Sequence, residues 1–204
     1  MNNKKNLLEV RTLALIGIMT GLIIIMTMIP FLGFIPVGPI QATTLHIPVI
    51  IVGIVEGPLA GGILGFMFGV ISMIRAIVQP NPFSFMFMNP IIAILPRILI
   101  GVFAGLVYKA LKDKKGIGKA SIAISAAVGS LTNTIFVLGL IYLIYGQQYM
   151  ETVNKVKNQA NTSAIKLIGA TALSSGLAEM AVAAVIATPI CMALIRAFKK
   201  RRIA

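Results

Sequence analysis

Three polar side chains interrupt long apolar stretches of this sequence: Arg97, Asn133 and Glu179. Arg97 lies within NPIIAILPRILIGVFAGLVYK, residues 89–109, which is long enough to cross a bilayer, since about 20 apolar residues span the hydrocarbon core. An arginine at the bilayer centre costs about 2.5–3.5 kcal/mol, so such residues usually face a cavity or a partner. A guanidinium together with an amide suits a ligand that carries a carboxylate and hydroxyl or amide groups. We therefore expect Arg97 to anchor a small-molecule site inside a helical bundle.

Other roles for these polar residues remain open from the sequence alone. Arg97 could pair with Glu179 and be structural. His46 and Arg75 are placed at the outer ends of their helices, next to two apolar loops, and His46 could cap its helix rather than contact a ligand. The lone cysteine, Cys191, lies in the last apolar run and is expected to be a small core residue.

The sequence offers little for catalysis. It has no Ser/His/Asp arrangement, no HExxH motif and no Cys/His cluster, so we predict no enzyme activity, no metal and no cofactor. Gly118-Lys119 resembles part of a phosphate-binding loop, but that motif needs Gly at position 113 and Ser or Thr at position 120. The sequence has Asp113 and Ala120 there, so we expect no ATP site.

The composition indicates an integral membrane protein. Of 204 residues, 58% are hydrophobic and 11% are charged, whereas a soluble domain has about 25% charged residues. The net charge of +13 comes mainly from three basic clusters, at residues 4–11, 109–119 and 196–202. Basic residues concentrate in short cytoplasmic segments, so this placement argues against nucleic-acid binding and for cytoplasmic termini.

The apolar runs predict an all-α membrane protein with six transmembrane helices and both termini in the cytoplasm. A single membrane domain, residues 1–204, would hold helices at about 11–29, 46–55, 58–78, 90–111, 120–146 and 165–198. The first run is interpreted as a retained span and not a signal peptide, because no small-residue cleavage site follows it. The polar residues 147–164 are expected to form an extracellular loop, part of which could be helical.

The second of these helices is unusually short. At about 1.5 Å per residue, nine or ten residues reach only half of a ~30 Å core. The preceding segment, residues 30–46, is apolar but broken by prolines and glycines. Irregular backbone at membrane depth is tolerated only where it is buried in protein or lines a cavity. We expect residues 30–46 to form a lid over a pocket in the outer half of the membrane.

Small residues recur at every fourth position in two of the predicted helices. The first helix has Gly17 and Gly21; the third has Gly61, Gly65 and Gly69. Such spacing lets two membrane helices approach closely. The third-helix glycines could pack inside this bundle, or they could form a docking surface for another membrane subunit.

Three stretches give the chain a family resemblance: GFIPVGPIQATTLHIPVIIVGIVEGPLAGGILGFMFGVISMIRA, LPRILIGVFAGLVYK and GSLTNTIFVLGLIYL. They resemble the S component of energy-coupling factor (ECF) vitamin transporters, most closely the pantothenate-specific branch. The resemblance runs from residue 11 to about residue 195 and is weakest in residues 147–164. It implies a bacterial plasma-membrane subunit that binds a vitamin and works with a transmembrane coupling subunit and two ATPases.

The resemblance also implies roles for particular residues. Arg97 and Asn133 would contact the ligand, and His46, Arg75 and Asn89 are weaker candidates for the same role. The small-residue motif of the family's first helix, typically Ala-x-x-x-Ala, would fall on Gly17 and Gly21 and serve subunit docking.

Three functions follow as expectations. The first is pantothenate binding for an ECF importer, which Arg97 favours because the vitamin is an acid. The second is an S component for another water-soluble vitamin or precursor, such as pyridoxine, hydroxymethylpyrimidine or folate. The third is an autonomous small-solute carrier, although the sequence lacks the internal repeat that such carriers often show.

Overall fold

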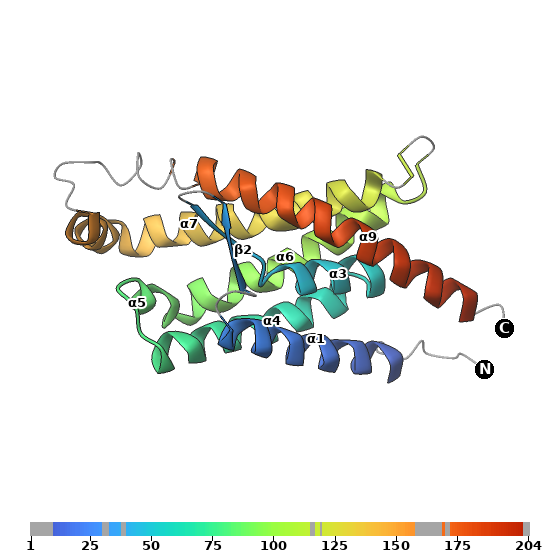
Figure 1. The fold of residues 1–204 in the computed structure, drawn as a ribbon, viewed down its shortest axis with the longest axis horizontal. Helices are drawn as coiled ribbons and strands as arrows, with labels where there is room; N and C mark the ends of the chain where they lie inside the picture. Colours follow the sequence, from blue (N-terminus) through green and yellow to red (C-terminus); the bar gives the residue numbers. More distant parts are fainter. Residues whose placement is uncertain are drawn as a thin grey trace.

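A bundle of long helices makes up most of the molecule (Figure 1). The computed structural model describes residues 10–29, 33–37, 40–114, 117–118, 120–157, 169 and 172–201. In this part of the chain, five helices are long and apolar enough to cross a membrane. They are α1 (Val10–Met28), α4 (Pro58–Val78), α6 (Pro90–Leu111), α7 (Ala120–Lys157) and α9 (Leu177–Arg201).

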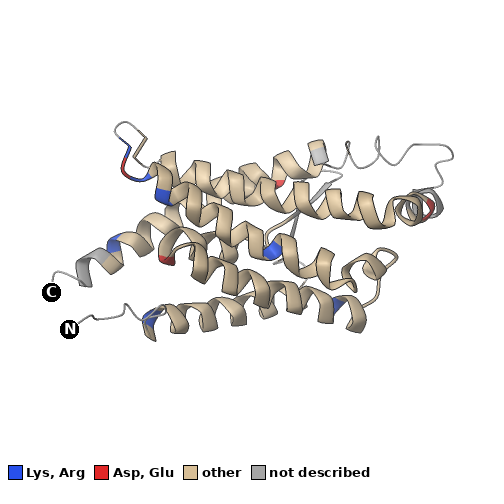
Figure 2. Ribbon diagram, turned by 180° about the vertical axis from the view of Figure 1, so that it is seen from behind, with Lys and Arg blue, Asp and Glu red and all other residues tan. Residues whose placement is uncertain are grey.

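The predicted helical membrane bundle is therefore confirmed, while the count of six spans and the cytoplasmic termini stay predictions. The beginning of α1 and the end of α9 lie at the same end of the bundle (Figure 1). Most of the charged positions are gathered near that end, and the rest of the bundle is largely free of charge (Figure 2). A short helix, α5 (Ser84–Phe87), lies at the opposite end, between α4 and α6.

The shortest predicted span is α3 (Ile47–Glu56), a ten-residue helix in the centre of the bundle. Every residue from 47 to 54 is buried, because the sequence IPVIIVGI is apolar on all sides. The helix packs against α1, α4, α6, α7 and α9. Since α3 is surrounded by protein, it does not need the length of a lipid-facing span.

The end of α3 is tied to α1 by polar contacts. Arg11 Nη2 lies 3.1 Å from Glu56 Oε1. The Thr12 hydroxyl donates a hydrogen bond to Glu56 Oε2 at 2.7 Å. Gly57, which follows, has a φ of 101° and lets the chain reverse into α4. Glu56 thus ties the turn between α3 and α4 to the first turn of α1. The turn lies where the sequence predicted it, between the helices expected at 46–55 and 58–78.

The predicted lid contains a feature that an all-α fold does not include. Two strands, β1 (Phe34–Val37) and β2 (Ile40–Thr43), form an antiparallel hairpin in which Phe34 pairs with Thr43. β2 packs against α9 and against a five-residue π-helix, η1 (Ala172–Gly176), that precedes α9 (Figure 1). Residues 30–32 and 38–39 of the predicted lid lie outside the described residues.

The predicted fifth and sixth helices correspond to α7 and α9. α7 runs from residue 120 to residue 157 with a kink at Tyr145, whose φ of −127° and ψ of 20° are not helical. The regular part before the kink matches the span expected at 120–146. The first part of the predicted sixth helix, residues 165–168 and 170–171, and the end of the predicted loop, residues 158–164, lie outside the described residues.

The glycines of α4 face α6. A Cβ at Gly61 would lie 2.8 Å from the Gly101 carbonyl oxygen, and one at Gly69 would lie 2.8 Å from the Ala93 carbonyl oxygen. A Cβ at Gly65 would overlap the Arg97 carbonyl oxygen. These contacts favour the packing alternative over a docking surface for the three glycines, because their bare face is covered by this chain's own α6. The close approach of α4 and α6 fixes where the backbone of Arg97 sits.

Candidate functional site

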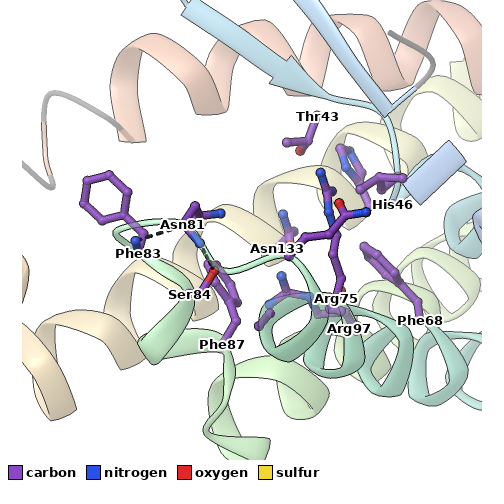
Figure 3. A pocket seen from close by; sticks show the side chains of 14 residues that line it. Thr43, His46, Phe68, Arg75, Asn81, Phe83, Ser84, Phe87, Arg97 and Asn133 are labelled. Carbon is purple, nitrogen blue, oxygen red and sulfur yellow. Dashed lines mark hydrogen bonds between the residues drawn. The ribbon is translucent and has the colours of Figure 1, made fainter. Parts of the chain in front are cut away.

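A cavity of about 360 Å³ lies inside the bundle, within the range of about 300–1,000 Å³ typical of small-molecule sites (Figure 3). It brings together four of the five predicted ligand contacts: His46, Arg75, Arg97 and Asn133. The other lining residues are Thr43, Leu45, Phe68, Ser72, Ala76, Gln79, Asn81, Phe83, Ser84 and Phe87. Taken together, all the residues that line the cavity come from β2, α4, α5, α6, α7 and the connections between them.

Arg97 is held in the bundle by the proline that precedes it. Pro96 has no N–H, so the carbonyl of Ile92, four residues earlier, has no partner in the helical ladder. Arg97 Nη1 donates to that carbonyl at 2.9 Å. This bond directs the guanidinium back along α6, and Arg97 is only 7% exposed.

Two aromatic rings flank the Arg97 guanidinium. Its Cζ lies 5.6 Å from the ring centre of Phe68 on α4 and 5.1 Å from that of Phe87 on α5, both within cation–π range (Figure 3). Among the described residues, Arg97 Nε is buried with no hydrogen-bond partner. The guanidinium thus lies between two rings, with one buried donor that has no partner among the described residues.

Asn133 on α7 and His46, directly before α3, are two further polar residues that line the cavity. Asn133 Oδ1 is buried and has no hydrogen-bond partner within the described part of the chain. His46 Nε2 lies 3.1 Å from the hydroxyl of Ser130, which is almost one helical turn before Asn133 on α7. His46 occupies the N-cap position of α3, yet its side chain makes no capping hydrogen bond to the described residues. The capping alternative is therefore not what the structure shows.

Arg75 and Asn89 occupy different surroundings. Arg75 lies in the last turn of α4 and lines the cavity. Asn89 is not among the described residues that line it. Its Oδ1 accepts from the N–H of Ile91, which caps α6, and its Nδ2 lies 3.5 Å from the Tyr145 hydroxyl. The structure thus gives Asn89 a local role at the start of α6.

Glu179 is not the ion-pair partner of Arg97. Its Oε1 accepts hydrogen bonds from the backbone N–H and the hydroxyl of Thr43, at 3.0 and 2.8 Å. Within the described ranges, the ion pair within 4.0 Å is the one between Arg11 and Glu56. No three His, Cys, Asp or Glu side chains of the described residues are grouped as metal ligands would be.

The family model described as "ECF transporter, substrate-specific component" matches residues 11–191. The chain belongs to this family. Two named relatives are similar over most of their length. "Pantothenic acid transporter PanT" of Lactococcus lactis subsp. cremoris is 32% identical over 173 residues, covering 78% of this chain and 80% of the relative. "Pantothenate transporter PanT" of Leuconostoc mesenteroides subsp. mesenteroides is 29% identical over 157 residues, covering 74% of each chain.

Family membership confirms the resemblance found in the sequence. This substrate-specific component is a membrane protein of a transport system, and its family consists of transporter subunits and not enzymes. The apolar helices α1, α4, α6, α7 and α9 agree with that location. The cavity is thus placed inside the membrane-embedded bundle of a transport component.

Sequence reasoning missed several residues that line the cavity of this substrate-specific component. The polar ones are Thr43, Ser72, Gln79, Asn81 and Ser84. Asn81 Oδ1 accepts from the N–H of Phe83, and Ser84 Oγ accepts from the N–H of Asn81, so the loop folds into a compact turn. The signal was available in QPNPFSFMFMNP, where polar and aromatic residues alternate between prolines, but it does not tell which of them turn inward.

Proposed function

We propose that this protein is the high-affinity pantothenate-binding subunit of an ECF-type importer. One observation carries the proposal: Arg97 and Asn133 line one cavity, and each has a buried polar atom, Arg97 Nε and Asn133 Oδ1, without a hydrogen-bond partner among the described residues. Leaving a buried polar atom unpaired costs about 1–3 kcal/mol, so a ligand that supplies both partners gains binding energy.

The two atoms specify complementary ligand groups. The guanidinium of Arg97 calls for an anionic acceptor, and a carboxylate suits it through charge-assisted hydrogen bonds. The carbonyl oxygen of Asn133 calls for an N–H or O–H donor. Pantothenate carries a carboxylate, an amide N–H and two hydroxyls, so it can satisfy both ends at once. The apolar surfaces of Leu45, Phe68 and Phe87 provide contacts for its dimethyl group.

The other vitamins fit this polar pattern less well. Pyridoxine and hydroxymethylpyrimidine have hydroxyl groups but no carboxylate to match Arg97. Folate has carboxylates, but on a much larger aromatic skeleton. The names of the two relatives support the same choice, since both are called pantothenate or pantothenic acid transporters.

The proposal includes a transmembrane coupling subunit and two ATPases as partners. We assign ATP hydrolysis to the partner subunits, because Asp113 and Ala120 occupy the positions at which a phosphate-binding loop needs glycine and Ser or Thr. Gly17 and Gly21 on α1 are the residues we propose for docking. No described atom lies within 4 Å of the position that a Cβ would take at either glycine, so this face of α1 is open.

A ligand screen on the purified protein tests the substrate. We expect labelled pantothenate to bind and to be displaced by unlabelled pantothenate, while pyridoxine, hydroxymethylpyrimidine and folate displace it poorly. Binding of one of those three with no binding of pantothenate would contradict the proposal. Uptake into vesicles separates the importer subunit from an autonomous carrier: we expect accumulation only when the coupling subunit, the ATPases and ATP are also present.

A further inference from the structure

The end of the β-hairpin is attached to α9 through a single carboxylate. Thr43, the last residue of β2, donates its backbone N–H at 3.0 Å and its hydroxyl at 2.8 Å to the same atom, Glu179 Oε1. We call these two hydrogen bonds the hairpin anchor. They join residues that are 136 positions apart in the sequence.

The surroundings of Glu179 favour a fixed carboxylate at this point. Glu179 lies in the first turn of α9, which continues directly from the π-helix η1. It is 7% exposed and is not among the described residues that line the cavity. The preceding π-helix, η1, also packs against β2, and such helices are found often at functional positions. The carboxylate thus lies at the junction of η1 and α9, beside the hairpin.

The hairpin anchor includes a residue of the cavity wall. Thr43 lines the cavity itself and stands opposite Arg97 and Asn133 in the close-up view (Figure 3). Thr44, which follows it, donates its N–H to the carbonyl of Gly33 at 3.0 Å and closes the base of the hairpin. If Glu179 releases Thr43, the end of β2 that lines the cavity loses its hydrogen bonds to α9.

We propose that Glu179 is a positioning residue that sets the rate of ligand release by holding Thr43 and the hairpin against the cavity. This inference rests on the proposed function, because pantothenate is the ligand whose release it governs. Two ordinary hydrogen bonds together are worth a factor of about ten to a hundred, so losing both should speed release by about that factor. Entry of ligand should change much less, since affinity differences between related complexes lie mostly in the dissociation rate.

Dissociation of labelled pantothenate from four purified proteins tests the inference. Glu179→Ala should release the ligand about ten- to a hundred-fold faster than wild type. Glu179→Gln keeps an oxygen that accepts from Thr43 and should restore most of the slow release. Thr188→Val is the matched control on α9, because the Thr188 hydroxyl bonds to the Ala184 carbonyl of its own helix, at 2.6 Å, and should release at the wild-type rate.

Two results would overturn the inference. Wild-type release from Glu179→Ala would show that the anchor does not control the cavity. Equally fast release from Glu179→Gln and Glu179→Ala would show that the charge itself matters and not the bonds to Thr43. If Glu179→Ala does not fold, Thr43→Val and Thr43→Ser replace it: the valine variant, which loses the hydroxyl, should release faster than the serine variant, and equal rates would count against the anchor.

Hydrogen exchange of the ligand-free protein separates this inference from the proposed function. The Thr43 amide should exchange faster in Glu179→Ala than in wild type, because its acceptor has gone, and should be unchanged in Thr188→Val. Unchanged exchange in Glu179→Ala would overturn the anchor even if pantothenate binds. If the wild-type protein bound no pantothenate, the proposed function would fail while faster exchange still established the anchor.

Discussion

Arg97 donates from Nη1 to the backbone carbonyl of Ile92 at 2.9 Å, and so takes the place of the helix bond that Pro96 cannot make. The proline and the arginine therefore act as a unit. The first exposes a carbonyl, and the second uses it to hold its guanidinium inside the bundle. A buried cation with one donor committed to its own helix keeps the remaining donors for a ligand.

The first prediction concerns this unit. Pro96→Ala restores an N–H that competes with Arg97 for the Ile92 carbonyl, so the guanidinium loses its fixed position. We expect pantothenate affinity to fall by about 2- to 13-fold, the equivalent of one ordinary hydrogen bond. Pro90→Ala is the matched control, since Pro90 is at the start of α6, where an N–H has no helical partner in any case. Equilibrium binding measures the affinity of each protein. Equal affinity of the Pro96→Ala and wild-type proteins would show that Pro96 does not position Arg97 for ligand binding.

The second prediction concerns Asn133. Asn133→Leu keeps the approximate volume of the side chain but removes the acceptor, so pantothenate affinity should fall by about 5- to 150-fold. The melting temperature of the ligand-free protein should not fall, because the lost Oδ1 is buried without a partner among the described residues. Thr132→Val is the control, since the Thr132 hydroxyl bonds to the Val128 carbonyl of its own helix. Full affinity in Asn133→Leu would remove Asn133 from the proposed site.

The third prediction concerns the contact between α4 and α6. Gly65→Leu places a side chain against the Arg97 carbonyl, and overpacking of this kind costs about 1–3 kcal/mol, so the protein should melt at a lower temperature and bind pantothenate less tightly. Thermal unfolding and equilibrium binding on the same sample measure both effects. A Gly65→Leu protein of wild-type stability would show that the two helices are not packed through this glycine.

A contrasting result is predicted for α1. A Cβ at Gly17 would have no described atom of the neighbouring helices within 4 Å, and Gly17 is exposed, so Gly17→Leu should leave stability and pantothenate affinity at wild-type values. Uptake by vesicles that also hold the coupling subunit and the ATPases should fall, because the new side chain stands on the proposed docking face. Wild-type uptake by Gly17→Leu would move the docking surface elsewhere on the molecule.

The sequence predicts the long helices and the meeting of Arg97 with Asn133 for one physical reason. A charge or an amide in an apolar helix is expensive in lipid, so both must turn inward, and two inward polar groups in a small bundle share a cavity. Arg75 and His46, which the family resemblance gave as weaker candidates, also line the cavity. Asn89 does not, because a polar residue directly before Pro90 can satisfy a helix end locally.

Other features depend on tertiary contacts that the sequence does not encode locally. The hairpin is made of two four-residue strands, one of which contains Pro36, and it is held by Glu179, 136 residues from Thr43. In the sequence, Arg97 and Glu179 are a possible ion pair because both are charged residues in apolar helices. Only the fold shows that the carboxylate of Glu179 accepts its hydrogen bonds from Thr43. In the sequence, Gly61, Gly65 and Gly69 could either pack inside the bundle or dock another subunit. The position of α6 against these glycines favours packing.

The most direct test of the proposed function is the affinity of Arg97→Ala for pantothenate. Removing one side of a buried charge pair costs about 2–5 kcal/mol, which is a loss of about 30-fold to several thousand-fold. Arg97→Lys should recover only part of this, because a lysine cannot reproduce the planar guanidinium. Lys109→Ala, which removes a charge from an exposed position near the end of the same helix, is the control.

The measurement is equilibrium binding of labelled pantothenate to the purified, folded variants, with thermal unfolding to show that each is intact. Our proposal predicts that Arg97→Ala binds at least about 30-fold more weakly than wild type, that Arg97→Lys falls between them, and that Lys109→Ala binds normally. A folded Arg97→Ala protein that binds pantothenate within a few-fold of wild type would contradict it.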